Sequence, residues 1–260
     1  MKRRWHNIFR DDRKAFVLAM DHGMGLNVLP EMKNPGEIIK RARNGGVDAI
    51  LTSFGIAYNF QKELGNMGLI LRIDGGSSQI ATEGAPTENL YSVEDAVRLG
   101  ADGILCMGFP GSKDEHMTIK NIAANAADSA KWGLVFGIEM LPFGFQKVPE
   151  ARTPENVALA CRMGAELGAD FIKTQFVGDK ETFHRIVEGC YRPILVLGGE
   201  RSNSDEDLLR MVKDAMDAGA SGVVFGRNIW KHPNIEGISR AISKIVHENA
   251  EVEKAMEELK

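Results

Sequence analysis

The chain has 260 residues and a mass of 28.5 kDa, and a single α/β barrel commonly uses about 250 residues, so one domain is the simplest expectation. Its 32 Lys and Arg against 36 Asp and Glu give a net charge of −4, which creates no overall field to attract nucleic acid or an anionic membrane. With 43% hydrophobic and 26% charged residues, the composition excludes a disordered chain and predicts a proper core.

The cysteines and the lengths of the apolar runs indicate the cellular compartment of the protein. Cys106, Cys161 and Cys190 are widely spaced and odd in number, which argues against a disulfide framework and a structural zinc site. The basic start of the chain runs into charged residues where a signal peptide would need an apolar stretch. Every apolar run is shorter than the roughly 18 residues that span a bilayer. We expect a cytoplasmic protein with no membrane or nucleic-acid partner.

Eight short apolar runs, rich in β-branched residues, alternate with longer segments of helical periodicity. In chain order the predicted strands are 16–20, 49–54, 69–73, 103–107, 134–140, 171–176, 194–197 and 222–225. Start signals mark some of the helices between them. Ser92-Val-Glu-Asp95 and Ser204-Asp-Glu-Asp207 have the pattern of capping boxes, and Thr153 is a cap before a proline at the first helical position.

A short motif recurs before every second predicted strand. The four copies are Gly46-Val-Asp-Ala-Ile, Gly100-Ala-Asp-Gly-Ile, Gly168-Ala-Asp-Phe-Ile and Gly219-Ala-Ser-Gly-Val. In each, the glycine supplies a left-handed helix end before the turn into a strand. This regularity fits a (β/α)8 TIM barrel better than an open doubly wound sheet. We therefore predict one barrel domain over 1–260, with an N-terminal extension at 1–14 and a C-terminal helical segment at 235–260.

In such a barrel the carboxyl ends of the strands gather on one face and line the active site. The polar residues expected there are Asp21, His22, Asp74, Glu139, Lys173, Gly198-Gly199-Glu200, Gly226 and Arg227. Lys173 stands out because burying an ammonium inside an apolar strand is costly unless something uses it. Desolvation and a neighbouring cation such as Arg227 would favour the neutral amine, which attacks carbonyls to form a Schiff base. Alternatively, this lysine reaches out to solvent or pairs with a carboxylate.

Two glycine elements follow the last two predicted strands. Gly198 and Gly199 come after strand seven, and Gly226 and Arg227 come after strand eight. Loops in these two places form the usual phosphate site of the fold, where free backbone N–H groups hold an anion and an arginine adds a fork of donors. A plain turn is the alternative for either pair alone, and together they favour a phosphate site.

Asp21 marks an abrupt change from apolar to ionisable residues at the end of strand one. Near a Schiff-base lysine it could take the proton of a substrate hydroxyl, although a solvated turn carboxylate is the alternative. His22 could assist or could serve as a structural hydrogen bonder. The other histidines are scattered, and neither a G-x-G-x-x-G turn opening a helix nor a Walker A loop is present, so we expect no metal and no cofactor.

With these motifs in this order and spacing, the chain resembles the archaeal-type class I fructose-bisphosphate aldolases of the DeoC/LacD superfamily. The motifs are Leu-Ala-Met-Asp-His-Gly, Phe-Ile-Lys-Thr-Gln-Phe, Leu-Gly-Gly-Glu and Phe-Gly-Arg-Asn-Ile-Trp. The resemblance runs from about residue 16 to 247. It implies a Schiff base on Lys173, acid/base work by Asp21 and phosphate binding by Gly198, Gly199, Gly226 and Arg227. It also implies a homo-oligomer, with decamers common among relatives.

One departure from the family pattern concerns the element after strand five. These aldolases carry Tyr-Pro-Arg-Gly there, and the tyrosine moves protons at the substrate carbon, whereas this chain has Leu141-Pro142-Phe143-Gly144. A leucine cannot transfer a proton, so either another group such as Glu139 or His116 replaces it, or the reaction is that of another member of the superfamily. The same superfamily contains a thiolase and a transaldolase-like synthase. The segment 114–122 resembles the thiolase branch more closely than the aldolases.

Three functions therefore follow from the sequence. The first is a metal-independent class I aldolase that cleaves or forms a C–C bond in a phosphorylated ketose through Lys173. The second is a thiolase, acyltransferase or transaldolase-like synthase that uses the same lysine on a phosphorylated dione or ketose. The third is a non-catalytic sensor of sugar phosphates or a structural barrel, which the missing tyrosine keeps open.

Overall fold

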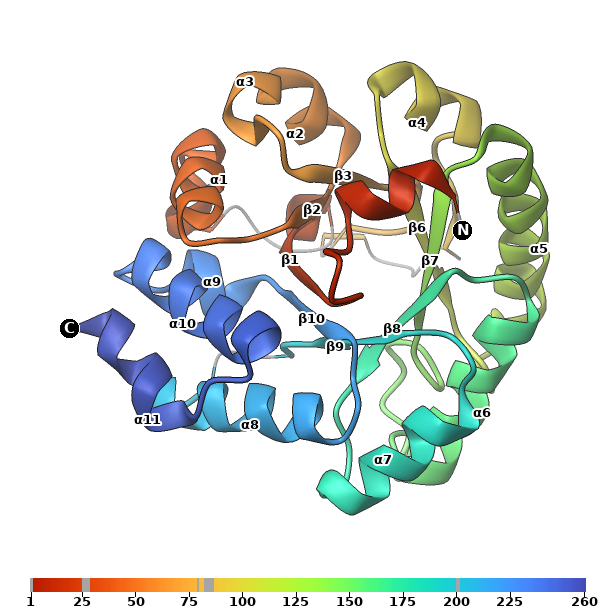
Figure 1. Cartoon of the computed structure of the whole chain (residues 1–260). Coiled ribbons are helices and arrows are strands. Elements are labelled where there is room, and N and C mark those ends of the chain that lie inside the picture. The colour runs from red at the N-terminus through yellow and green to blue at the C-terminus, as the bar shows by residue number, and fades with distance from the viewer. Residues whose placement is uncertain (1, 25–28, 79, 82–86, 200–201) are drawn as a thin grey trace.

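A computed structural model describes residues 2–24, 29–78, 80–81, 87–199 and 202–260. Eight parallel strands close into a barrel in the order β1-β10-β9-β8-β7-β6-β3-β2, so that each strand lies beside its neighbours along the chain (Figure 1). The strands are β1 (Ala15–Met20), β2 (Ala49–Thr52), β3 (Gly68–Arg72), β6 (Gly103–Gly108), β7 (Val135–Met140), β8 (Phe171–Gln175), β9 (Ile194–Leu197) and β10 (Gly222–Phe225). The prediction of a (β/α)8 barrel is confirmed. A small antiparallel pair, β4 (Asp74–Gly75) and β5 (Glu88–Asn89), lies outside the barrel sheet.

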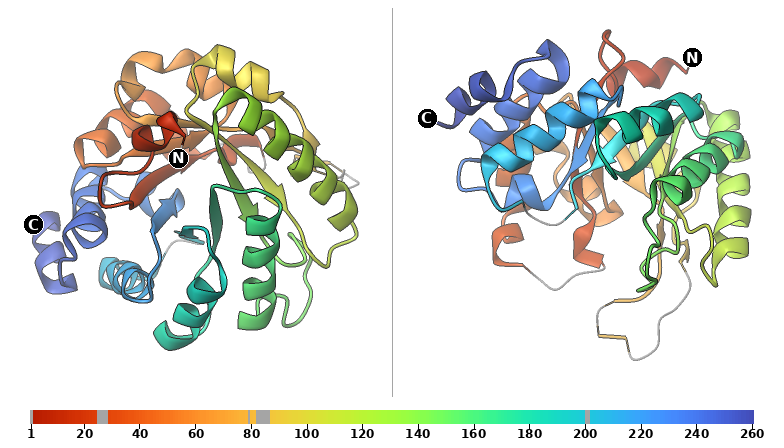
Figure 2. Two further views of the ribbon diagram at one scale, coloured as in Figure 1. Left: turned by 45° about the vertical axis from the view of Figure 1, so that its right-hand side comes forward. Right: turned by 90° about the horizontal axis from the view of Figure 1, so that it is seen from below.

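The helices form the outer layer around this barrel (Figures 1 and 2). They are α1 (Pro35–Asn44), α2 (Phe54–Asn59), α3 (Gln61–Leu64), α4 (Val93–Leu99), α5 (Glu115–Trp132), α6 (Pro154–Glu166), α7 (Lys180–Gly189), α8 (Asp205–Asp217), α9 (Arg227–Trp230), α10 (Ile235–Glu248) and α11 (Val252–Ala255). Their apolar faces and the outer faces of the strands form the main core, in which Leu18, Ile138 and Val212 are completely buried. Each such side chain contributes about 1.5–3 kcal/mol of hydrophobic stabilisation. Among the described helices, none is both long and apolar enough to cross a membrane.

The predicted helix starts are present with one difference. Ser92 accepts a hydrogen bond from the Asp95 N–H, and the Asp95 carboxylate accepts one from the Ser92 N–H, so the capping box is complete. Thr153 caps α6 ahead of its first-turn proline. Ser204 caps α8 by accepting a hydrogen bond from the Asp207 N–H, but here the Asp207 carboxylate accepts from the Ser204 hydroxyl and not from the Ser204 N–H, so this capping box is incomplete in the described structure. The strand predicted at 49–54 is two residues too long, because Ser53 is the N-cap of α2.

The repeated glycine motif performs two structural tasks. Gly46, Gly100, Gly168 and Gly219 have φ angles of +90°, +85°, +102° and +96°, a region that favours glycine. In three of the four copies the residue two positions after the glycine is an aspartate. Its carboxylate accepts a hydrogen bond from a backbone N–H of the barrel strand that comes before it in the chain. The pairs are Asp48 with the Phe16 N–H (2.7 Å), Asp102 with the Leu69 N–H (3.0 Å) and Asp170 with the Phe136 N–H (2.8 Å).

The same three aspartates hold the N-terminal segment across the amino end of the barrel. Their partners there are the side chains of Arg10 for Asp48, Asn7 for Asp102 and Lys2 for Asp170. The segment lies across the barrel end that faces the viewer in Figure 1. Its Trp5, Ile8 and Phe9 side chains are buried against the barrel interior, and Phe9 meets Phe171 edge to face at 5.7 Å. The predicted extension therefore closes one end of the barrel.

Alternation along the strands separates an apolar interior from a charged layer above it. Residues that point inward recur at every second position, so Ala19, Ile70, Val135 and Phe171 fill the interior. Gly137 leaves room for Phe171, because a Cβ there would lie 2.2 Å from the phenyl ring. The next inward positions toward the carboxyl end are charged on four strands or strand ends: Asp21, Arg72, Glu139 and Lys173.

Candidate active site

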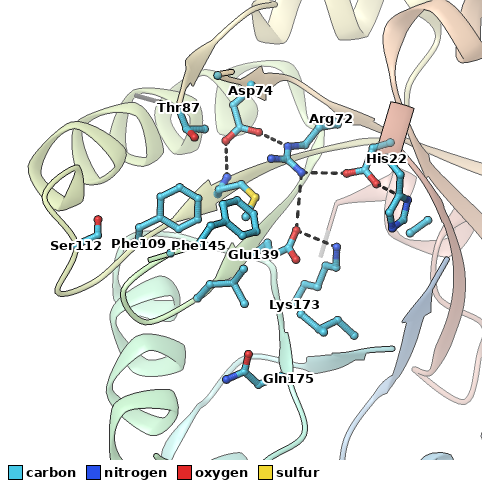
Figure 3. A pocket seen from close by; sticks show the side chains of 18 of the residues that line it. His22, Arg72, Asp74, Thr87, Phe109, Ser112, Glu139, Phe145, Lys173 and Gln175 are labelled. Atoms are coloured by element: carbon cyan, nitrogen blue, oxygen red, sulfur yellow. Dashed lines mark hydrogen bonds and ion pairs between the residues drawn. The ribbon is translucent and has the colours of Figure 1, made fainter. Parts of the chain in front are cut away.

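A cavity of about 790 Å³ opens at the carboxyl end of the barrel (Figure 3). Eight of the site residues predicted from the sequence line it: Asp21, His22, Glu139, Lys173, Gly198, Gly199, Gly226 and Arg227. They come from five different strands or strand ends that the chain order keeps far apart. Glu200, the last residue of one glycine motif, lies outside the described residues.

Lys173 lies at the centre of β8 with only 6% of its surface exposed. Glu139 on β7 is its register partner, and Glu139 Oε2 accepts a hydrogen bond from Lys173 Nζ at 2.8 Å. The sequence left open whether this lysine pairs with a carboxylate or serves as a nucleophile. The structure shows the pair, and it places the pair on the wall of the cavity, where a bound carbonyl could reach the amine.

Arg72 is a functional candidate that sequence reasoning missed. It ends β3, and its Nη1 lies 2.9 Å from Asp21 Oδ2 and 3.8 Å from Glu139 Oε2. The expected neighbouring cation was Arg227, but it is Arg72 that shares the Glu139 carboxylate with Lys173. The signal available in the sequence was a charged residue at an inward position at the end of a strand, the same signal that identified Lys173.

Asp74 fixes Arg72 from the other side. One carboxylate oxygen of Asp74 accepts a hydrogen bond from Arg72 Nε, and the other accepts one from the Met107 N–H at 2.6 Å. Burial raises the pKa of Asp74 above its ordinary value, although Arg72 acts in the opposite direction. Asp74 was expected at the active face and is there, as a cavity-lining residue that holds the guanidinium in place.

Asp21 and His22 follow β1 directly and lie beside each other, with His22 Nδ1 3.6 Å from Asp21 Oδ1. Burial alone would raise the pKa of Asp21, but the charges of Lys173 and Arg72 outweigh it, and the pKa lies below its ordinary value. Burial lowers the pKa of His22, although Asp21 opposes this. At neutral pH the site therefore presents an ionised aspartate next to a neutral imidazole.

The two glycine elements lie together, as expected. Asn228 joins them, because its side-chain amide donates to the Gly198 carbonyl at 3.0 Å while Asn228 itself belongs to α9. At Gly226 a Cβ would lie 2.4 Å from His22 Cε1 and 2.8 Å from the Ala19 carbonyl, so only glycine fits against the imidazole. Gly199 has a φ of +59° and open space around its Cα.

The element after β7 contains no proton donor at the position of the family tyrosine. Leu141 is 5% exposed and packs with Met107 and Phe109 in the cavity wall. Arg152 donates to the carbonyls of Pro142 and Gly144 and so holds this loop, a role that the sequence did not reveal. His116, one proposed substitute for the tyrosine, is exposed near the start of α5 and does not line the cavity as the structure describes it.

Three buried polar atoms on the cavity wall have no hydrogen-bond partner among the described residues. They are Gln175 Nε2, Arg227 Nε and His22 Nδ1. An unpartnered buried polar group costs free energy that a bound acceptor can return. Gln175 was not singled out from the sequence, although it lies two positions beyond Lys173 on the same strand and so shares its inward face.

A (β/α)8 barrel whose mouth holds a buried lysine, several carboxylates and glycine loops is suited to Schiff-base chemistry on an anionic carbonyl compound. Comparison with known proteins agrees. The model of the DeoC/LacD family aldolases matches residues 15–232. The fructose-bisphosphate aldolase class 1 of Thermoproteus tenax is 33% identical over 246 residues, which cover 92% of each chain. The 2-amino-3,7-dideoxy-D-threo-hept-6-ulosonate synthase of Halobacterium salinarum is 32% identical over 97% of this chain and 94% of its own.

A solved structure of a Schiff-base-forming fructose-1,6-bisphosphate aldolase superimposes with a TM-score of 0.86. It is 32% identical and covers 94% of this chain and 98% of its own. The chain belongs to the DeoC/LacD family of aldolases, as the resemblance predicted. It is an aldehyde-lyase of the class I type.

Proposed function

We propose that this aldolase cleaves or forms a C–C bond in a phosphorylated ketose, with Lys173 as the residue that forms the Schiff base. The observation that carries the proposal is the burial of Lys173 in the wall of the cavity, hydrogen-bonded to Glu139. Burying an ion pair costs free energy, and apolar side chains at a purely structural position would avoid that cost. The named relatives support a sugar bisphosphate as the substrate class.

Glu139 is the proposed acceptor of the first proton. At 2.8 Å it can take a proton from Nζ, which leaves a neutral amine to attack the substrate carbonyl. One proton of the attacking amine and the proton held by Glu139 then leave with the carbonyl oxygen as water, which returns Glu139 to its ionised form. The resulting iminium draws electrons from the neighbouring C–C bond. Glu139 is also our proposed substitute for the family tyrosine, since it is a carboxyl group within reach of the reacting nitrogen.

Asp21 is the proposed base for bond cleavage. Its pKa lies below the ordinary value because the charges of Lys173 and Arg72 outweigh burial, so it is ionised at neutral pH and able to accept the proton of the substrate hydroxyl. His22 lies beside it and against Gly226, and we propose that it orients Asp21.

The phosphate is proposed to bind at Gly198, Gly199, Gly226 and Arg227. Gly199 and Gly226 lack side chains that would cover their backbone, and Arg227 Nε is a buried donor without a partner in the described part of the chain. A phosphate would satisfy that donor and would anchor one end of the ketose near Lys173.

The thiolase, acyltransferase or transaldolase-like alternative is not favoured, because the family model and the matching solved structure both describe aldolases. The test of the proposal is borohydride reduction in the presence of dihydroxyacetone phosphate and other phosphorylated ketones, followed by peptide mass spectrometry. We expect a reduced adduct on Lys173 and none in Lys173→Met. Turnover without any adduct, or an adduct on another lysine, would refute the assignment.

Two further expectations stay proposals. We propose that the chain forms a homo-oligomer, a decamer by the family resemblance, which sedimentation velocity can measure. We also propose a cytoplasmic location, supported by three free, buried cysteines whose thiols suit a reducing compartment.

A further inference from the structure

Arg72 occupies the centre of the charged cluster at the cavity floor (Figure 3). Its Nη1 donates to Asp21 Oδ2 at 2.9 Å and lies 3.8 Å from Glu139 Oε2, while its Nε donates to Asp74. Its side chain is only 15% exposed. The guanidinium therefore contacts both carboxylates proposed to act in the reaction, yet the reaction assigns it no proton to carry.

The geometry of Arg72 is fixed rather than adaptable. Asp74 is 3% exposed and binds both Arg72 and the Met107 N–H, so it ties the guanidinium to β6. A guanidinium does not lose its proton in proteins, and its planar fork presents donors in fixed directions. Arg72 is thus a permanent positive charge in a set place.

We propose that Arg72 is a positioning residue that gives the two carboxylates different roles. It keeps Asp21 ionised as the base, and it leaves Glu139 free to accept the proton of Lys173. The inference rests on the proposed function. The asymmetry of the contacts supports it, because Asp21 has a direct hydrogen bond to Arg72, whereas Glu139 lies 3.8 Å away and bonds to Lys173 instead.

Proton accounting shows when Arg72 matters most. In the first step an N–H bond of the Lys173 ammonium breaks and an O–H bond forms at Glu139 Oε2, which leaves a neutral amine and a neutral carboxyl. Two charges near Asp21 have then disappeared. Burial keeps the pKa of the adjacent His22 below its ordinary value, so that ring adds no positive charge near pH 7. Until the iminium forms and returns a positive charge to the Lys173 nitrogen, Arg72 is the cation in direct contact with Asp21 that remains.

Other charged groups around the two carboxylates have to be considered as well. Asp21 faces Arg72, Lys173 and His22. Glu139 faces Lys173 and Arg72 and interacts at longer range with Arg152, Asp74 and His22. Arg227 interacts with His22 from the side of the phosphate loops. Of these cations, Lys173 and Arg72 act most strongly on Asp21, and the charge of Lys173 is absent from its deprotonation until the iminium forms.

The test compares Arg72→Gln, which removes the charge, with Arg72→Lys, which keeps it. The ionisation midpoint of Asp21 is measured by infrared titration, with its carboxyl band identified by its absence in Asp21→Asn. The titration is carried out in the wild type and in Lys173→Met, which imitates the loss of the lysine charge. We expect Arg72→Gln to raise the midpoint by at least about one pH unit, more in Lys173→Met than in the wild type, and Arg72→Lys to restore most of it.

The pH profile of kcat/KM gives a second readout that a merely structural residue would not move. The acidic limb should shift upward in Arg72→Gln by the same amount as the Asp21 midpoint. An Asp21 midpoint that does not shift, or a kcat/KM that falls by the same factor at every pH, overturns the inference. If Arg72→Gln does not fold, Asp74→Asn is the second variant, because it keeps the charge of Arg72 but releases the guanidinium from its anchor. An Asp21 midpoint that is the same in Asp74→Asn as in the wild type also overturns the inference.

Failure of the proposed function is distinguishable from failure of this inference. A wild-type protein that forms no borohydride adduct on Lys173 refutes the Schiff-base reaction and the role of Asp21 as its base together. An adduct on Lys173 combined with an Asp21 midpoint that ignores Arg72 refutes the inference alone.

Discussion

Glu139 and Lys173 are register partners on β7 and β8, and their side chains meet in a 2.8 Å hydrogen bond on the wall of the cavity. The two residues are 34 positions apart, and only the barrel brings them together. Both are buried, so removing either one leaves a charge without its main partner. This pair gives the first two predictions.

The stability of the pair can be measured by a double-mutant cycle. Lys173→Met and Glu139→Gln should each lower the free energy of unfolding by about 1–3 kcal/mol, because a buried polar group loses its partner while Arg72 compensates in part. The double variant should lose less than the sum of the two. Urea unfolding followed by circular dichroism measures all four proteins, and strictly additive losses would contradict the coupling.

The role of Glu139 in proton transfer can be separated from that stability effect. Glu139→Gln should slow formation of the adduct on Lys173 by about 100-fold, because an amide cannot accept the proton of Nζ. Rapid-quench borohydride trapping measures this rate. Glu139→Asp is the control, since it keeps the carboxylate. An unchanged rate in Glu139→Gln would mean that another group takes the proton.

The buried imidazole of His22 predicts a pH dependence of stability. Burial lowers its pKa in the folded protein, so as the pH falls below about 6.5 the unfolded chain binds a proton that the folded protein does not. The stabilising contribution is present above that pH and is lost as the pH falls through the folded pKa. His22→Gln should therefore lose less stability than the wild type between pH 7 and pH 5 in urea titrations. Parallel losses in the two proteins would count against a depressed pKa.

The glycine loops provide a matched pair of substitutions. Gly226→Ala should destabilise the protein by about 1–3 kcal/mol and raise KM for a phosphorylated substrate, because the new methyl group would lie 2.4 Å from His22 Cε1. Gly199→Ala meets open space and carries only the cost of its φ of +59°, about 1–2 kcal/mol. Thermal unfolding and steady-state kinetics measure both. An unchanged KM in Gly226→Ala would remove this loop from the phosphate site.

The sequence by itself determined the barrel and picked out several of the charged residues that line its cavity. Regular alternation of apolar runs and helical segments fixes the fold, since each element has to bury one face against the others. Lys173 can be identified from the sequence because burying an ammonium in the apolar strand Phe-Ile-Lys-Thr-Gln-Phe costs free energy, and that short segment alone shows the conflict. The glycines before alternate strands were also readable, because a left-handed helix end needs glycine wherever it occurs.

Only the tertiary structure decided which charges meet. Arg72 joins Asp21 to Glu139 because the register of seven strand pairs and the closure of β1 onto β10 set the level of each strand in the barrel. The aspartates of the repeated motif bind the N-terminal segment for the same reason. A hydrogen bond depends on tenths of an ångström between residues that the sequence separates by dozens of positions, and no local pattern encodes that distance. Composition and periodicity therefore specified the scaffold, while packing and register specified the electrostatics of the site.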